Sequence, residues 1–349
     1  MTISEDRPAV SVPPDSAPRR RDGRVVGGLA QVVALVCLLP MVAVALAALT
    51  GGTDTVAHLL DTVLPGYALT TLKLAALVAA GTLVIGVGTA WLVTSARFPG
   101  ARWLEIALVL PLAFPAYVLA YAYTFVLDHP GIVQATLRQV TGWGPRDYWF
   151  PEIRSEGGAA LMLVLVLYPY VYLLARAAFL QQSAAAFVAA RTLGRTQFGA
   201  FWSVSLPMAR PAIAGGVLLA VMETIADYGT VAHFGVPTFA TGIYTSWFSL
   251  ADRAGAAQLA LCLLSFALVL AVLERQTRGA ARYHGAGKRH VGLPPRQLSG
   301  GRAIAATLAC ALPVVLGFAL PVVILLAMGI GSEQDLLSRR YTGFIRNSL

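Results

Sequence analysis

Seven long apolar stretches limit this chain to one broad kind of fold. About twenty consecutive apolar residues allow a helix to cross the hydrocarbon core of a membrane. Backbone groups in lipid must be satisfied within the segment, so we expect these stretches to be membrane helices. The sequence therefore predicts an all-α, polytopic helical bundle. The predicted spans are residues 26–50, 67–95, 103–127, 158–180, 212–234, 256–273 and 303–330.

The composition agrees with a membrane protein. The chain is 57% hydrophobic and 12% charged, whereas soluble domains are about one quarter charged. The net charge of +9 suggests nucleic acid at first sight, but short basic loops on one side of a membrane explain it, and we expect no nucleic-acid partner. Residues 1–25 are rich in Pro, Ser, Asp and Arg, and we expect a disordered tail.

Basic residues alternate from loop to loop, which predicts an orientation. The loop at residues 51–66 holds no Lys or Arg, whereas residues 181–211 hold Arg191, Arg195 and Arg210 and no acid. Residues 274–302 are also rich in Lys and Arg. Basic loops stay in the cytoplasm. We therefore expect the N-terminus, the 181–211 loop and the 274–302 linker to be cytoplasmic, and the protein to be multi-pass.

A weak internal repeat suggests two units. Leu39-Pro40 opens one apolar run and Leu320-Pro321 lies in another. We interpret residues 26–273 as a first unit of about six helices, residues 274–302 as a linker, and residues 303–349 as the truncated start of a second unit. Its last residues, 341–349, would begin an eighth helix. The alternative is a seven-helix protein with a short tail.

The loop at 181–211 has a pattern of its own. Residues 184–190 favour a helix, Gly194 can break it with a positive φ, and Pro207 and Pro211 are expected to stop a second short helix. Such a bent pair can dock in a groove of a soluble partner or pack on lipid or on its own bundle. Its aromatic residues, at helical spacing, are Phe198, Phe201 and Trp202.

The loop resembles a known element. The runs Ala189-Ala190-Arg191-Thr192-Leu193-Gly194 and Val204-Ser205-Leu206-Pro207 are similar to the cytoplasmic EAA loop of permease subunits from bacterial binding-protein-dependent ABC importers (type I, MetI-like). One departure is that Val188 occupies the glutamate position of that family. The resemblance implies a loop that inserts into an ATPase subunit. The implied coupling residues are Val188, Ala189, Ala190, Arg191, Gly194, Phe198, Val204, Leu206 and Pro207.

The same resemblance implies partners and a location. It implies an ATPase subunit dimer, a periplasmic substrate-binding protein, surrounding membrane lipid and possibly a second permease unit. It places the chain in the bacterial inner membrane, with ATP bound only on the partner subunit and no cofactor in this chain. Residues 208–216, 223–230 and 239–244, with Trp247, look most like permeases of fused ferric iron importers. Thiamine, sulfate, polyamine and phosphonate permeases share much of this pattern.

Two acids lie inside the predicted fifth span. Glu223 and Asp227 are four residues apart and share a helix face. An acid at mid-membrane costs about 2.5–3.5 kcal/mol and usually faces an aqueous path or the bundle interior. One interpretation is a translocation path for a cation, lined by Glu223, Asp227 and Tyr228. The other is structural, with Asp227 paired to Lys73 and Glu223 bonded to Thr224. A secondary transporter coupled to protons or sodium through the two acids is the rival function.

The sequence offers no pattern for catalysis. The histidines are scattered, without the spacing of a metal site. The run Gly285-Ala286-Gly287-Lys288-Arg289 lacks the Ser or Thr and the preceding strand of a phosphate loop. We therefore expect no catalytic residue, no metal site and no enzymatic activity in this chain.

Overall fold

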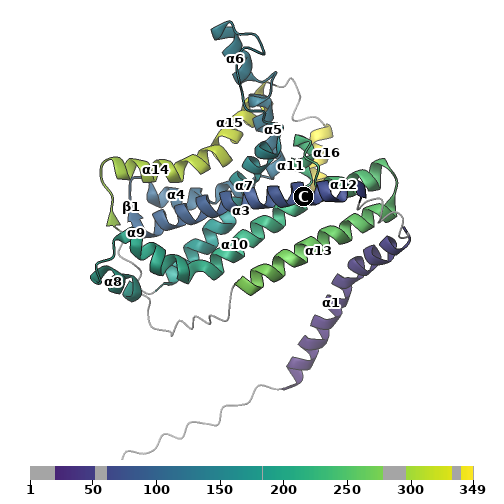
Figure 1. Cartoon of the computed structure of the whole chain (residues 1–349), viewed down its shortest axis with the longest axis horizontal. Coiled ribbons are helices and arrows are strands. Elements are labelled where there is room, and N and C mark those ends of the chain that lie inside the picture. The colour runs from purple at the N-terminus through teal and green to yellow at the C-terminus, as the bar shows by residue number, and fades with distance from the viewer. Residues whose placement is uncertain (1–19, 52–60, 183, 278–295, 332–338, 349) are drawn as a thin grey trace, which may run out of the picture.

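The computed structural model describes residues 20–51, 61–182, 184–277, 296–331 and 339–348. Within them, six helical segments are long and apolar enough to cross a membrane, or seven if a sharply bent pair counts as one span. This agrees with the predicted polytopic all-α bundle (Figure 1). The described part of the expected N-terminal tail is already helical from Arg20, and residues 1–19 lie outside the described residues.

The long helices follow the predicted spans closely in most cases. They are α1 (Arg20–Leu49), α3 (Leu64–Ser95), α7 (Glu156–Gln181), α10 (Leu206–Ala226), α13 (Arg253–Thr277), α14 (Gly301–Val314) and α15 (Leu320–Ile330). The shorter α-helices are α4 (Ala101–Ala107), α5 (Ala116–Leu127), α6 (Ile132–Thr141), α8 (Ala184–Thr192), α9 (Gln197–Ala200), α11 (Gly229–Phe234), α12 (Phe239–Tyr244) and α16 (Arg339–Ser348). The other turns are η1 (Leu110–Ala113), η2 (Phe201–Ser205), η3 (Thr245–Ser249) and η4 (Val315–Ala319).

Helix α7 is the centre of the bundle, and α3 and α10 pack against it. Close approach is possible because glycines face it on both sides. A Cβ built on Gly216 would lie 2.8 Å from the Cα of Val171, and one built on Gly86 would lie 2.7 Å from the Val171 Cβ. Small residues let membrane helices approach until their backbones touch. The two glycines therefore allow α3 and α10 to pack closely on α7 at the same residue, Val171.

The third predicted span is broken into two helical segments. The 3₁₀ turn η1 contains Pro111, Pro115 precedes α5, and the segments on either side meet at 92°. Proline removes a backbone donor and its ring opposes a straight helix. The π-turn η4 between α14 and α15 packs at this break, where Gly317 lies against Pro111 and the Tyr123 hydroxyl donates to the Leu316 carbonyl at 2.8 Å.

The fifth span differs from the prediction at both ends. Pro207 and Pro211 do not stop a helix, because α9, the π-turn η2 and α10 run continuously from Gln197 to Ala226. A π-turn widens the helix just before Pro207, and proline is tolerated in the first turn of the helix that follows. At the other end, α10 ends at Ala226, so the predicted limit at residue 234 is wrong. The chain turns at Asp227 into the separate helix α11.

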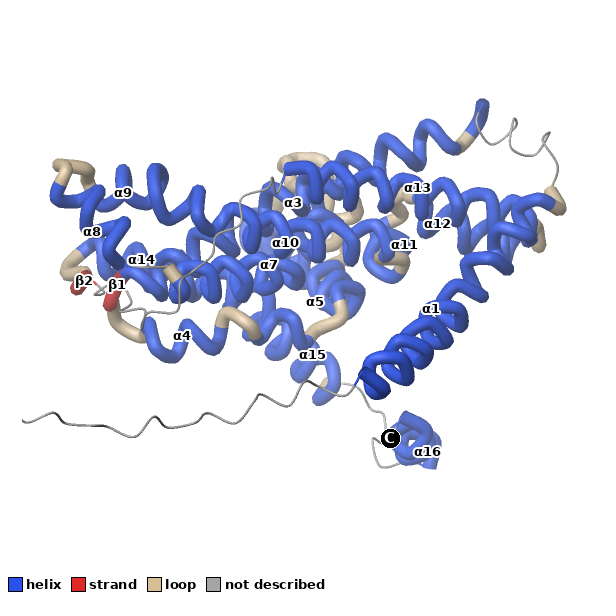
Figure 2. The backbone as a smooth tube through the Cα atoms, turned by 90° about the horizontal axis from the view of Figure 1, so that it is seen from below, coloured by secondary structure: helices blue, strands red, loops and turns tan. Residues whose placement is uncertain are grey.

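The linker predicted at 274–302 is ordered at both described edges. Helix α13 continues to Thr277, and β2 (Arg296–Gln297) pairs in parallel with β1 (Ala96–Arg97). Residues 278–295, which include the run 285–289, lie outside the described residues. Figure 2 shows this strand pair beside α8 and α9. The start of the last apolar segment is thereby fixed next to the loop at 181–211.

Candidate functional site: a coupling loop and an acidic cavity

The loop between α7 and α10 forms two helices bent at a glycine, as the sequence suggested. Helix α8 ends at Thr192, Gly194 has a φ of +85°, and α9 begins at Gln197. The Thr196 side chain accepts a hydrogen bond from the Gly199 amide at 3.0 Å and caps α9. Because only glycine adopts a positive φ without strain, Gly194 fixes the angle between α8 and the long helical run that begins with α9.

The three aromatic residues of this loop lie on one side of the helix, with each pair of ring centroids between 5.6 and 6.5 Å apart. Phe198 and Trp202 are 69% and 55% exposed, but Phe201 is buried. The predicted common side is therefore confirmed, but its members differ in exposure, because Phe201 lies at the inner edge against the bundle. Together with Leu193, which is 85% exposed, Phe198 and Trp202 form an apolar surface that we name the loop patch.

Phe201 instead joins an aromatic cluster that anchors the loop to the bundle. Trp91 of α3 lies at the centre of this cluster, with its ring centroid 4.6 Å from Phe201, 5.5 Å from Phe179 and 5.9 Å from Phe187. These four rings come from α3, α7, α8 and η2. Aromatic pairs at such distances stabilise packing beyond the area they bury. The cluster therefore links both loop helices to two membrane helices.

Polar contacts hold the base of the loop. The Gln182 side chain donates to the Ser205 carbonyl at 2.7 Å, and Arg296 donates to the Gln197 side chain at 3.2 Å. The other predicted coupling residues occupy two environments. Val188, Ala189 and Arg191 are exposed, whereas Ala190, Val204, Leu206 and Pro207 are partly buried.

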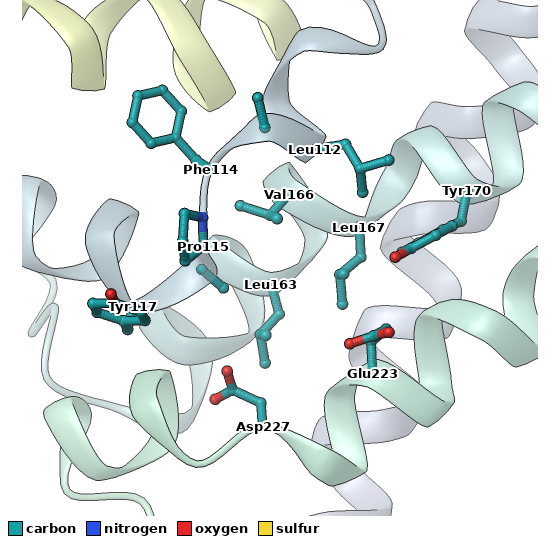
Figure 3. A pocket seen from close by; sticks show the side chains of 12 residues that line it. Leu112, Phe114, Pro115, Tyr117, Leu163, Val166, Leu167, Tyr170, Glu223 and Asp227 are labelled. Carbon is teal, nitrogen blue, oxygen red and sulfur yellow. The ribbon is translucent and has the colours of Figure 1, made fainter. Parts of the chain in front are cut away.

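A cavity of 380 Å³ opens beside the broken third span (Figure 3). Both acids of the predicted path line it, together with the phenol side chains of Tyr117 and Tyr170. Its lining includes no basic side chain. The other lining residues are Leu112, Ala113, Phe114, Pro115, Ala116, Leu163, Val166 and Leu167.

The two acids have different surroundings. The Asp227 carboxylate accepts hydrogen bonds from the Thr230 amide at 3.0 Å, the Thr230 hydroxyl at 3.0 Å and the Val231 amide at 3.2 Å. It therefore caps α11. Glu223 has no ion pair or hydrogen bond among the described residues. Figure 3 shows its carboxylate near Tyr170, on the same side of the cavity.

The structural alternative for these acids is wrong in its details. Lys73 is exposed and forms no ion pair with Asp227 within the described chain. The Thr224 hydroxyl donates to the Ala220 carbonyl at 2.8 Å rather than to Glu223. The third predicted path residue, Tyr228, lies outside the cavity lining and stacks on Tyr244 with centroids 4.3 Å apart.

Sequence reasoning missed a second charged site. Glu105 of α4 and Arg176 of α7 form an ion pair, with about a third of each side chain exposed. The Tyr172 hydroxyl also donates to the Glu105 carbonyl at 2.7 Å. Residues 71 positions apart leave no periodic signal. The available hint was an unmatched acid and an unmatched base in two apolar spans, which tend to pair.

These features define a class of protein: a polytopic helical bundle with an exposed loop bent at a glycine and a polar cavity at a broken span. The family model for the binding-protein-dependent transport system inner membrane component matches residues 82–278. That range is more than half of the chain, so the chain belongs to this family. It is a multi-pass permease subunit of a type I ABC importer in the inner membrane.

Curated relatives carry different substrates in their names. The molybdenum transport system permease protein ModB of Escherichia coli (strain K12) is 28% identical over 208 residues, which cover 58% of this chain and 87% of ModB. The Fe(3+)-transport system permease protein FbpB 2 of Haemophilus influenzae is 24% identical over 218 residues, which cover 62% of this chain and 38% of that protein. A sulfate permease, CysT of Chlorokybus atmophyticus, is 30% identical over 149 residues, or 42% of this chain and 48% of its own length.

A solved structure shares the fold. A chain of a bacterial alginate ABC transporter, in complex with an alginate-bound periplasmic protein, superposes with a TM-score of 0.61 at 15% identity. The match covers 74% of this chain and 95% of the other. At that identity the likeness concerns the fold alone.

Proposed function

We propose that this chain imports ferric iron, delivered by a periplasmic binding protein and driven by a separate ATPase that docks on the loop patch. The observation that carries the choice of cargo is the cavity, which presents two carboxyls, two phenols and no basic side chain. Hard cations prefer oxygen ligands. A path lined by acids repels oxyanions such as molybdate and sulfate and admits cations.

The cargo passes the cavity without being held there. The described residues contain no cluster of three or more His, Cys, Asp or Glu side chains that could hold a metal ion. Conduction requires binding strong enough for entry and weak enough for release. We assign the attraction of the cation to Glu223, whose carboxylate has no other partner, with Asp227 adding negative charge from its place at the start of α11.

The aromatic cluster around Trp91 supports the driving role of the loop. Movement of α8 and η2 is transmitted to α3 and α7 because Phe187, Phe201 and Phe179 all contact that indole. The loop patch offers the docking surface for the ATPase, with its apolar side chains directed away from the bundle. Val188 lies on the exposed side of α8, so the proposed docking is apolar at the position where the family resemblance implies a glutamate.

A second permease unit is part of the proposal. Only 6% of the apolar part of α1 is buried, and α13 is its main described contact. The last segment, α14 to α15, instead packs into the break of the third span. We propose that α1 packs against a second permease unit. We also propose that the N-terminus and the loop lie in the cytoplasm, in line with the charge of the loops.

Uptake measurements test the cargo. Cells that lack this chain and cells that carry it are compared for uptake of radiolabelled ferric iron and of molybdate. We expect the chain to restore iron uptake and to leave molybdate uptake unchanged. Restored molybdate uptake with unchanged iron uptake would refute the choice of cargo. Iron uptake that survives ATP depletion but fails with an uncoupler would refute the ATPase drive.

Co-purification tests the docking surface. The double variant Phe198→Ala/Trp202→Ala removes the two exposed rings of the loop patch, and we expect it to lose the ATPase subunit that purifies with the unaltered chain. The control is Leu219→Ala on α10, which removes an apolar side chain of similar exposure, 47%, away from the loop. Equal ATPase recovery with the double variant would show that docking does not use this surface.

A further inference from the structure

Helix α6 (Ile132–Thr141) is amphipathic with its polar face turned inward. Gln134 is only 7% exposed and Arg138 is partly buried, whereas Val140 is 81% and Ile132 56% exposed. In a helix surrounded by water the polar face points outward. The exposed face contains no charged residue. Its stripe is formed by Ile132, Val133, Thr136 and Val140, which fall within about one third of the helix circumference, and the exposed Gln139 borders the stripe beside Ile132.

A hydrogen-bond network fixes this orientation. The Gln134 side chain donates to the Leu127 carbonyl at 3.0 Å and accepts from the Tyr148 hydroxyl at 2.9 Å. Arg138 donates to the same Tyr148 hydroxyl at 2.9 Å and to the His129 carbonyl at 3.0 Å. The polar face is thereby bonded to the connection that follows α5. The apolar stripe cannot turn inward without breaking these bonds.

The position of α6 indicates what covers the stripe. Helix α5, the second half of a membrane span, ends at Leu127, and α6 begins at Ile132. Helix α7 starts at Glu156 and ends at the loop, so the connection that carries α6 leads into the end of α7 opposite to the loop. Figure 1 shows α6 projecting from the bundle beyond α5. A short amphipathic helix next to the end of a membrane segment is expected at the level of the lipid headgroups.

Two tryptophans strengthen this placement. Trp143 and Trp149 are 47% and 86% exposed and follow α6 in the same connection. Tryptophan is enriched at membrane–water interfaces, where its apolar ring and its N–H group are both accommodated. Aliphatic stripes on short helices enter the boundary between headgroups and acyl chains in the same way.

We propose that α6 is an interfacial helix whose stripe is covered by membrane lipid, on the side of the membrane opposite to the loop. The apolar stripe lies in the lipid, while Gln134, Arg138 and Tyr148 hold the polar side to the protein. The helix anchors the bent third span at its far end, so that the break at Pro111 and Pro115 keeps its place beside the cavity.

Spin labels on the full chain in lipid nanodiscs test this proposal. With Cys37, Cys262 and Cys310 replaced by Ala, labels are placed at Val140→Cys in the stripe and at Thr141→Cys, an exposed neighbour about 100° further round the helix. We expect the ratio of oxygen to nickel-chelate accessibility to be at least about threefold higher at position 140 than at 141. Equal nickel access at both positions would place the stripe in water and overturn the proposal.

A protein partner gives a third, distinct result. If a soluble protein or a second unit covers the stripe, the label at position 140 is shielded from both oxygen and nickel, which also overturns the proposal. A measurement on the chain with its native cysteines provides a check on folding. Lipids brominated near the headgroups should quench less fluorescence in Trp149→Phe than in the unaltered chain. Quenching that is identical in the two proteins would contradict the lipid contact.

Discussion

Two pairs of charged side chains lie within the bundle, and they are built in opposite ways. Glu105 and Arg176 neutralise each other and join α4 to α7. Glu223 and Asp227 have no basic partner within the described chain and face a cavity. A charge in a membrane bundle is retained when it is paired or when it has a function. The first pair therefore joins two helices, and the proposed role of the second is to offer negative charge to a passing ion.

The largest expected effect on stability comes from breaking the ion pair between Glu105 and Arg176. Arg176→Leu leaves the Glu105 carboxylate without a partner between α4 and α7. Exposed pairs contribute up to about 1 kcal/mol and buried ones lose about 3–5 kcal/mol when one partner is removed, so this partly exposed pair should cost about 2 kcal/mol. Thermal unfolding in detergent should show the loss, and transport should fall with the amount of folded protein.

The double variant Glu105→Gln/Arg176→Gln is the control for that experiment. It removes both charges, keeps the volume of the Glu105 side chain and shortens that of Arg176, so it should recover more than half of the stability lost in Arg176→Leu. A double variant as unstable as Arg176→Leu would mean that packing, and not charge pairing, explains the effect.

The unpaired acid should show the reverse pattern. We expect Glu223→Gln to lower iron transport about tenfold, equivalent to about 1.4 kcal/mol, while the thermal midpoint stays close to that of the unaltered chain. The reason is that no bonded contact is lost, because the carboxylate has no ion pair or hydrogen bond with the residues that the structure describes. Glu223→Asp keeps the charge and should retain most of the transport. A stability loss as large as that of Arg176→Leu would make Glu223 structural.

Sequence reasoning found only one of these pairs, and the reason is geometric. Glu223 and Asp227 are four residues apart, so helical periodicity alone placed them on one face. Asp227 proved to lie just beyond α10, because it caps α11, and no propensity marked that break in an apolar run. The pairing of Glu105 with Arg176 depends on how α4 and α7 pack, which a single sequence does not encode locally.

The loop at 181–211 also combines a feature that the local sequence predicts with one that depends on a distant contact. Its bend at Gly194 could be predicted, because glycine alone adopts that φ freely. The burial of Phe201 could not, since it follows from contact with Trp91, more than one hundred residues earlier in the chain. Spans and local turns were thus predictable, whereas contacts between distant helices were not.

A smaller effect distinguishes the two acids of the cavity. Asp227 both lines the cavity and caps α11. Asparagine caps a helix about as well as aspartate, whereas alanine costs about 1 kcal/mol. If the cap is its main role, Asp227→Asn should keep transport within about twofold and Asp227→Ala should lose more, together with some stability. Transport and unfolding should be measured on both variants. Equal, severe loss of transport in both, with Asn as stable as Asp, would assign the charge itself to the path.

The smallest effect is expected at a third pair of charged residues, a more exposed ion pair that can be compared with Glu105 and Arg176. Asp128 and Arg154 lie in the connection after α5, with their side chains 26% and 45% exposed and 2.7 Å between the carboxylate and the guanidinium Nε. Partial desolvation raises the pKa of Asp128. Hydrogen bonds from Arg154 and from the His129 amide, with the nearby positive charges, together lower it by more than this, so the pKa lies below its usual 3.8.

A depressed pKa gives this pair a defined pH dependence. The folded state binds the proton of Asp128 less readily than the unfolded chain does, so the stabilisation is present above about pH 4 and is lost as the pH falls through the folded-state pKa. Because water screens the pair, Asp128→Asn should cost at most about 1 kcal/mol at neutral pH, and less than Arg176→Leu. In unfolding measurements from pH 6 down to pH 3, the difference between Asp128→Asn and the unaltered chain should shrink. A difference that grows as the pH falls, or one that exceeds the loss in Arg176→Leu, would show that exposure does not set the strength of ion pairs in this bundle.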